Sequence, residues 1–112
     1  MINQDQHNFL RLMAHTYLLY GKVNQAHSVL NFLALFMPEE PWGHALLAYT
    51  YLRLGEPQKA LTSAQSALDC PKMEKLPELR NVANIIKGEA LWSVGQKSEA
   101  RLLALETFRY LN

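Results

Sequence analysis

The chain has 112 residues, 49% of them hydrophobic and only 19% charged, which is enough for one domain with its own core. Its net charge of +1 and its lack of a lysine or arginine cluster argue against nucleic acid or an anionic membrane surface as the partner. The single cysteine excludes an internal disulfide framework and favours a reducing cytoplasm, and the sequence has the pattern of neither a signal peptide nor a membrane-inserting segment.

Apolar residues recur at helical spacing along the whole chain, and prolines and glycines mark the boundaries between the helical segments. The predicted helices span residues 5–20, 23–37, 41–54, 57–69, 77–94 and 97–111. The segment 70–77 is the one predicted long loop. No stretch shows the alternation of a β-strand, so the sequence predicts an all-α protein.

Three glycines, each followed five positions later by an alanine, mark an internal repeat. The pairs are Gly21 with Ala26, Gly55 with Ala60, and Gly95 with Ala100. The first two glycines are 34 residues apart and the last two are 40 apart, so about six residues are inserted before the third unit. A 34-residue period of helical hairpins is typical of tetratricopeptide repeats. We therefore predict three tetratricopeptide-like hairpins stacked into a short right-handed superhelix.

All 112 residues are predicted to form one such domain. Its repeats lie at about residues 7–40, 41–74 and 81–112.

The residues that often carry catalysis are scattered along the chain. His7, His15, His27 and His44 lie on at least three predicted helices, have no metal-ligand spacing, and are expected to be partly exposed. Cys70 has Lys72 and Lys75 nearby, which would lower the thiol pKa, but no histidine base beside it. We predict no catalytic residues, no metal and no cofactor.

Two pairs of acidic residues are explained by their positions at predicted helix starts. Glu39 with Glu40, and Glu74 with Glu78, flank predicted helix starts, where a carboxylate favours the positive end of the helix dipole. The five glycines are single and mostly in turns, so no phosphate-binding loop is present. The chain is therefore predicted not to be an enzyme.

In a stack of helical hairpins the first helix of each pair lines the concave face. These three helices carry apolar residues on more than one stripe, which predicts burial on more than one side. The predicted partner-binding residues are Leu12, His15, Leu19, Trp42, Leu46, Tyr49, Leu52, Ile85, Ile86 and Trp92. The same stripes also contain Arg11, Leu18, Ala45, Arg53, Val82, Glu89 and Ser93.

An exposed apolar patch of this size implies a partner, and an amphipathic helix laid into the groove is the expected ligand. The competing interpretation places the same residues in an ordinary core, and it is left open whether Trp92 faces a partner. Arg11 and Arg53 are the only cations on these stripes, which disfavours a clamp for a terminal carboxylate. Leu102, Leu105 and Phe108 on the last helix predict an open apolar end, covered by the same partner or by a second copy.

The first unit resembles the opening of YscY (SctY)-type chaperones of bacterial type III secretion. The resemblance lies in residues 6–12, 20–22 and 25–30, with Pro38 and Glu39, and the total length and three-repeat layout also match. It implies a small chaperone in the bacterial cytoplasm that holds a small secreted partner of the YscX (SctX) type, as a 1:1 heterodimer, and helps present it to the export gate. The alternatives are a chaperone of the needle subunit or a translocator, and a self-associating helical scaffold.

Overall fold

The computed structural model describes the backbone of residues 2–111 and the side chains of residues 2–109, and within this part of the chain every regular element is helical. The elements are α1 (Gln4–Leu19), α2 (Val23–Phe36), α3 (Pro41–Arg53), α4 (Pro57–Asp69), the 3₁₀ helix η1 (Pro71–Lys75), α5 (Pro77–Ser93) and α6 (Lys97–Leu111). The all-α prediction is confirmed, and each predicted α-helix ends within one residue of its observed boundary. No helix of residues 2–111 combines the length and apolarity needed to cross a bilayer.

The segment predicted as a long loop contains η1, which corrects that prediction. Pro71 fixes the backbone at the first position of η1, where a missing N–H costs little. Met73 is 2% exposed and packs with Ala45 and Leu79, so the inserted residues are held by the core rather than left as a loop.

Local sequence signals explain where the helices begin. Proline occupies the first turn of α3, α4 and α5, where its φ angle suits a helix and its lack of an N–H matters least. The start of α1 carries a capping box, in which the side chains of Asn3 and Gln6 each accept a hydrogen bond from the other's backbone N–H.

The three hairpin turns have one geometry. Gly21, Gly55 and Gly95 have φ angles of 73°, 74° and 92°, a conformation that side chains disfavour. The residue after each glycine donates its N–H to a carbonyl five positions back: Lys22 to Tyr17 at 2.8 Å, Glu56 to Tyr51 at 2.8 Å, and Gln96 to Leu91 at 2.9 Å. This pattern ends α1, α3 and α5 alike and turns the chain into the partner helix.

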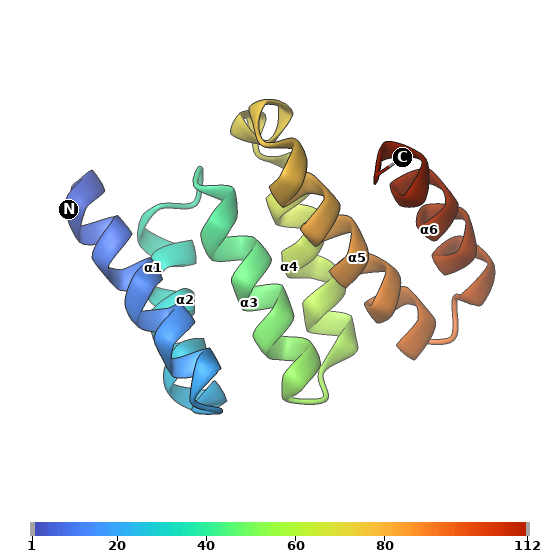
Figure 1. Ribbon diagram of the computed structural model, residues 1–112. Helices are drawn as coiled ribbons and strands as arrows, with labels where there is room; N and C mark the ends of the chain where they lie inside the picture. Colours follow the sequence, from blue (N-terminus) through green and yellow to red (C-terminus); the bar gives the residue numbers. More distant parts are fainter. Residues whose placement is uncertain (1, 112) are drawn as a thin grey trace.

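Each helix packs mainly against its neighbours in the sequence, and α3 also contacts α5. Figure 1 shows α1, α3 and α5 in a row, with α2 and α4 behind them and α6 at the far end. The alanines of the repeat, Ala26, Ala60 and Ala100, are all buried. Gly43 of α3 faces α2, and a Cβ added to it would lie in ordinary van der Waals contact, 3.5 Å from Leu33 Cβ. The core therefore runs as a layer between the helices of the row and those behind it.

Candidate protein-binding groove

One hollow of about 420 Å³ opens on the row of α1, α3 and α5. It is lined by His15, Leu18, Leu19, Leu46, Tyr49, Leu52, Val82, Ile85, Ile86 and Glu89, which we call the groove residues. Seven of the ten predicted partner-binding residues belong to this set, and they come from three helices up to 71 residues apart in the sequence. The lining residues lie in the C-terminal halves of α1 and α3 and in the middle of α5, where the three helices share this hollow.

The groove has an exposed rim and a buried floor. Leu19 is 72% exposed, Ile85 48% and Tyr49 37%, so the rim presents large apolar side chains to solvent. Ile86 is only 6% exposed and packs in a core cluster with Ala48 and Ala64. Ile86 was predicted to bind a partner, but its burial makes it mainly a core residue that reaches the floor of the groove. Exposed apolar rims over a packed floor are typical of interaction surfaces.

Three predicted binding residues lie outside the groove. Leu12 is 62% exposed on α1, and it does not line the hollow. Trp42 is half-buried against the cluster of Ala45, Met73 and neighbouring residues, with the Arg11 guanidinium 4.7 Å from its ring centre. Ala45, expected on the groove stripe, is 1% exposed in the same cluster. Met73 of η1 and Leu79 and Ala83 of α5 belong to this cluster, so Trp42 and Ala45 pack inward against both elements.

The two arginines expected on the groove stripes, Arg11 and Arg53, each contact an aromatic side chain. Besides Arg11 on Trp42, Arg53 Nη1 donates a 3.0 Å hydrogen bond to the hydroxyl oxygen of Tyr49. Apart from Tyr49, the ionisable groove residues are His15 and Glu89, and both side chains are exposed. The lining is thus dominated by aliphatic and aromatic carbon, and it suits an apolar protein segment rather than a charged small molecule.

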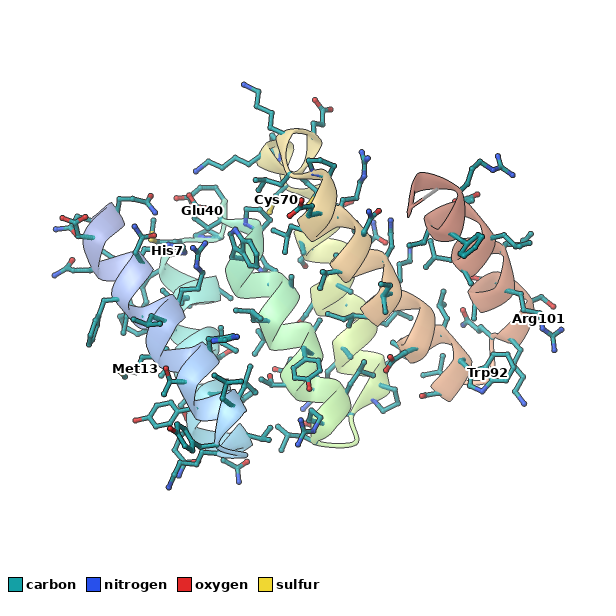
Figure 2. The ribbon with its side chains drawn as sticks, viewed as in Figure 1. His7, Met13, Glu40, Cys70, Trp92 and Arg101 are labelled. Atoms are coloured by element: carbon teal, nitrogen blue, oxygen red, sulfur yellow. The ribbon has the colours of Figure 1, made fainter. Side chains whose placement is uncertain are left out.

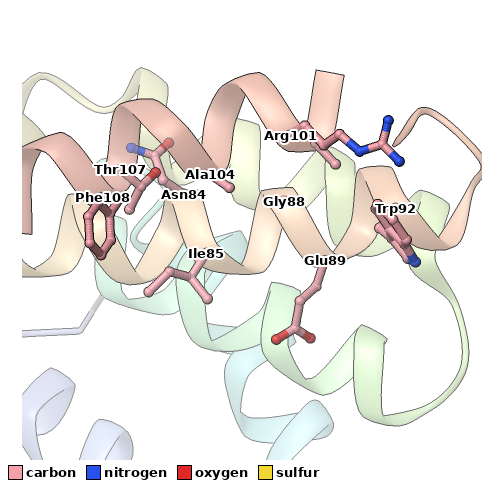
Figure 3. A pocket seen from close by; sticks show the side chains of 10 residues that line it. Asn84, Ile85, Gly88, Glu89, Trp92, Arg101, Ala104, Thr107 and Phe108 are labelled. Atoms are coloured by element: carbon pink, nitrogen blue, oxygen red, sulfur yellow. The ribbon is translucent and has the colours of Figure 1, made fainter. Parts of the chain in front are cut away.

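A second hollow of about 400 Å³ lies between α5 and α6 (Figure 3). We call it the α5–α6 cavity; it is lined by Asn84, Ile85, Gly88, Glu89, Trp92, Ala100, Arg101, Ala104, Thr107 and Phe108. Ile85 and Glu89 line both hollows, so the cavity adjoins the groove along α5. Trp92, the third predicted residue outside the groove, is 46% exposed here.

Two cations approach Trp92 from the start of α6. Lys97 Nζ lies 4.8 Å and Arg101 Cζ 5.7 Å from the centre of its ring, and Figure 2 shows Trp92 and Arg101 side by side at this end. The sequence-based list of binding residues included none of the α6 residues that line this cavity. The signal that could have found them is the repeat spacing, because Ala100, Ala104 and Thr107 lie 40 positions after three buried alanines of α4.

The histidines do not converge on a site. His7 is 1% exposed, which corrects the expectation that all four would be partly exposed. The ring of His27 makes an edge contact with Tyr51 at 5.1 Å between centroids, and His44 Nε2 lies 2.8 Å from the carbonyl oxygen of Pro38. Among residues 2–111, no three His, Cys, Asp or Glu side chains gather as metal ligands.

Cys70 is buried between α4 and η1, and its thiol lies 3.3 Å from the carbonyl oxygen of Ser66. Burial raises the pKa of this thiol, and the nearby acidic groups, led by Asp69, raise it further. Lys72 lowers the pKa, as expected, but its effect is smaller than those of burial and the acidic groups, so the pKa of Cys70 is raised on balance. A thiol with a raised pKa is a poor nucleophile at neutral pH.

One of the lysines near Cys70, Lys72, is paired with the Glu40 carboxylate. Glu40 is 8% exposed and forms an ion pair with Lys72 of η1, so it ties the start of α3 to the inserted segment. Glu40 and Cys70 lie at the same end of the molecule (Figure 2). This pair adds a tertiary role to the helix-start position predicted for Glu40, and pairing with Glu40 raises the pKa of Lys72.

Comparison with known proteins adds no relative to this description. No protein-family model, no curated protein sequence and no solved structure matches the chain. The groove and the α5–α6 cavity therefore have to be interpreted from their own chemistry.

Proposed function

We propose that the protein is a helical-repeat chaperone that binds a segment of a small partner protein in the apolar groove. The observation that carries the proposal is the groove itself, with Leu19, Tyr49 and Ile85 exposed on three different helices. Water contact with such a surface is unfavourable at roughly 25 cal/mol for each Å² of apolar area, so a partner that covers it gains affinity. An amphipathic helix with an apolar face fits a groove of this character.

The fold that we propose for this role is a tetratricopeptide-like right-handed superhelix of three hairpins. Its support is the 34-residue step between Gly21 and Gly55 together with the same turn geometry in all three hairpins. In such an array the first helix of each hairpin lines the concave face. The groove residues come from α1, α3 and α5, which are those first helices.

The resemblance to YscY (SctY)-type chaperones gives the proposal a specific partner. In this proposal the ligand is a small secreted protein of the YscX (SctX) type, bound 1:1 in the bacterial cytoplasm and then presented to the export gate. The mechanism is coverage: the groove shields the partner's apolar face from aggregation or early assembly, and no bond is made or broken. Tyr49 and Trp92 belong to the residue types that dominate the energetics of protein interfaces.

Two other functions follow from the same surface with a different occupant. A chaperone of a needle subunit or of a translocator would use the groove in the same way. A self-associating scaffold would bury the groove in a homodimer instead. The groove lining alone does not choose among them, whereas the oligomeric state of the purified protein does.

Co-expression with the small proteins encoded beside it, followed by light scattering on the purified material, tests the proposal. We expect a stable complex of one chain with one partner. A stable homodimer that ignores every candidate partner would favour the scaffold. A soluble monomer that binds none of them would refute the chaperone function.

A further inference from the structure

The α5–α6 cavity occupies a position that the fold fills elsewhere with a helix. Each cavity residue of α5 and α6 corresponds in the repeat to the residue of α3 or α4 that lies 40 positions earlier in the sequence. Ile85, Gly88 and Trp92 correspond to Ala45, Ala48 and Leu52, and Ala100, Ala104, Thr107 and Phe108 correspond to Ala60, Ala64, Ala67 and Leu68.

In the second hairpin these positions are covered by α5. Ala45 and Ala67 share a core cluster with Leu79 and Ala83, early in α5. Farther along the same helices, Ala48 and Ala64 share a cluster with Ile86. The order of these contacts shows that α5 runs parallel to α3. α5 places a small residue, Ala83, against Ala45 and Ala67, and a large one, Ile86, against Ala48 and Ala64.

In the first hairpin α3 plays the same part. Ala14 and Leu30, which correspond to Ala48 and Ala64, pack in one cluster with Leu47 of α3. The small residue is Gly43, 40 positions before Ala83, and a Cβ added to it would lie 3.5 Å from Leu33 Cβ. Both hairpins therefore accept a parallel helix that has a small residue followed three or four positions later by Leu or Ile.

In the third hairpin the corresponding surface has no such helix among the described residues. Ile85 is 48%, Trp92 46% and Phe108 64% exposed, and Ala104 also faces solvent, whereas Ala45, Ala48 and Ala64 are at most 1% exposed. We propose that the α5–α6 cavity docks one helix of a partner protein, parallel to α5, as the next helix of the stack. Its small residue lies opposite Thr107 and its Leu or Ile lies opposite Gly88 and Ala104.

Charge and dipole fit this orientation. A helix parallel to α5 has its C-terminal end near Trp92, beside Lys97 and Arg101 at the start of α6. The C-terminus of a helix carries partial negative charge, and cations there are favourable. The second hairpin has Pro57 and Leu61 at the positions of Lys97 and Arg101, so the two cations are specific to the open cavity.

A second copy of this chain is a poor occupant. Its α1 is the helix that would continue the stack, and 34 positions before Gly43 it carries Phe9. Phe9 is 62% exposed and would occupy the position where α3 and α5 have glycine and alanine. A side chain of that size would meet Thr107 and Phe108 in the cavity, at the position where Gly43 on the first hairpin has room for little more than a Cβ. The fit therefore favours a partner helix over head-to-tail stacking.

The test uses a helix known to fit the second hairpin. A fluorescently labelled peptide with the sequence of residues 77–91, which contains the small-to-large pattern and no tryptophan, is titrated with the intact protein and followed by anisotropy. We expect saturable binding and, in a Trp42→Phe background in which Trp92 is the remaining tryptophan, a blue shift of the emission. The variant Ala104→Glu should weaken binding by about tenfold or more, since it buries a charge against the docked helix. Replacing the peptide residue that corresponds to Ala83 by leucine should weaken binding by about as much through overpacking.

Leu102→Glu is the matched control, because Leu102 is exposed on α6 and does not line the cavity. It should change the affinity by less than about twofold, as expected for a surface position away from the contact. Absence of binding, or binding that Ala104→Glu leaves unchanged, would overturn the proposal. So would a homodimer that Ala104→Glu dissociates. The proposal does not depend on what fills the groove, so Leu19→Glu should leave this binding intact.

Discussion

Two neighbouring isoleucines on α5 test the division between groove and core. Ile86→Ala removes three carbon atoms from a side chain that is 6% exposed among Ala48 and Ala64. At about 0.8 kcal/mol for each buried CH₂ group, and with a further cost for the cavity, the loss is about 3 kcal/mol. Ile85→Ala removes the same atoms from a side chain that is 48% exposed, so its cost is about 1 kcal/mol.

Urea denaturation followed by far-ultraviolet circular dichroism measures both losses. With a slope of about 1.5 kcal/mol per molar urea, Ile86→Ala should lower the midpoint by about 2 M and Ile85→Ala by less than about 1 M. Ile85→Glu should keep the native helical signal, because the side chain can remain in solvent. Equal midpoints for the two alanine variants, or unfolding of Ile85→Glu, would show that Ile85 belongs to the core and that the groove is misassigned.

Three further results follow from local geometry. Gly55→Ala should destabilise the fold by about 1 kcal/mol because the φ angle of Gly55 is +74°, whereas Gly43→Ala, in a helix with space for a Cβ, should be neutral or stabilising by up to about 1 kcal/mol in the same urea titration. Cys70 should react with iodoacetamide more slowly in the native than in the unfolded protein, with a titration midpoint above the ordinary thiol pKa of 9.0, because burial raises its pKa. Since pairing with Glu40 raises the Lys72 pKa above 10.5, that pair should stabilise the fold fully below pH 10.5 and lose its effect as the pH rises further, so the difference in urea midpoint between wild type and Lys72→Met should vanish in alkali.

The helix boundaries were predictable because their causes are local. Gly55 and Gly95 end helices through their own φ angles, and Pro41 and Pro57 start helices through theirs. Neither effect depends on distant residues, so a pattern along the sequence is enough to place them. The repeat spacing is local in the same sense, since it is set by one hairpin turn that recurs.

The assignment of side chains to groove or core was only partly predictable. A shift of one residue rotates a side chain by about 100° around a helix, so stripes next to each other are easily exchanged. Trp42 and Ala45 pack inward because Met73 of η1 and residues of α5 share their cluster, and nothing local to α3 signals those contacts. Ile86 is buried because α5 crosses Ala48 and Ala64, which lie about 20 to 40 residues away in the sequence.

The repeat pattern predicts more than the positions of the helices, because it also relates the residues of the α5–α6 cavity to core residues of the second hairpin. The spacing of 40 residues relates Ala104 to Ala64 and Gly88 to Ala48, and both alanines are core residues. A comparison of repeat positions, rather than of apolar stripes, thus identifies the surface that the third hairpin leaves open. Burial in the second hairpin was needed to interpret it, because the sequence alone does not show which helix covers those alanines.

The most direct test of the groove is the affinity of the proposed YscX (SctX)-type partner for two leucine variants, measured by isothermal titration calorimetry. Leu19 on α1 and Leu35 on α2 are 72% and 71% exposed, and each lies near the C-terminal end of its helix, but only Leu19 lines the groove. We expect 1:1 binding to wild type and to Leu35→Glu, and a loss of about tenfold or more in affinity for Leu19→Glu, since a buried carboxylate would lack a partner. Equal affinities for the two variants, or a greater loss for Leu35→Glu, would contradict the groove as the binding site.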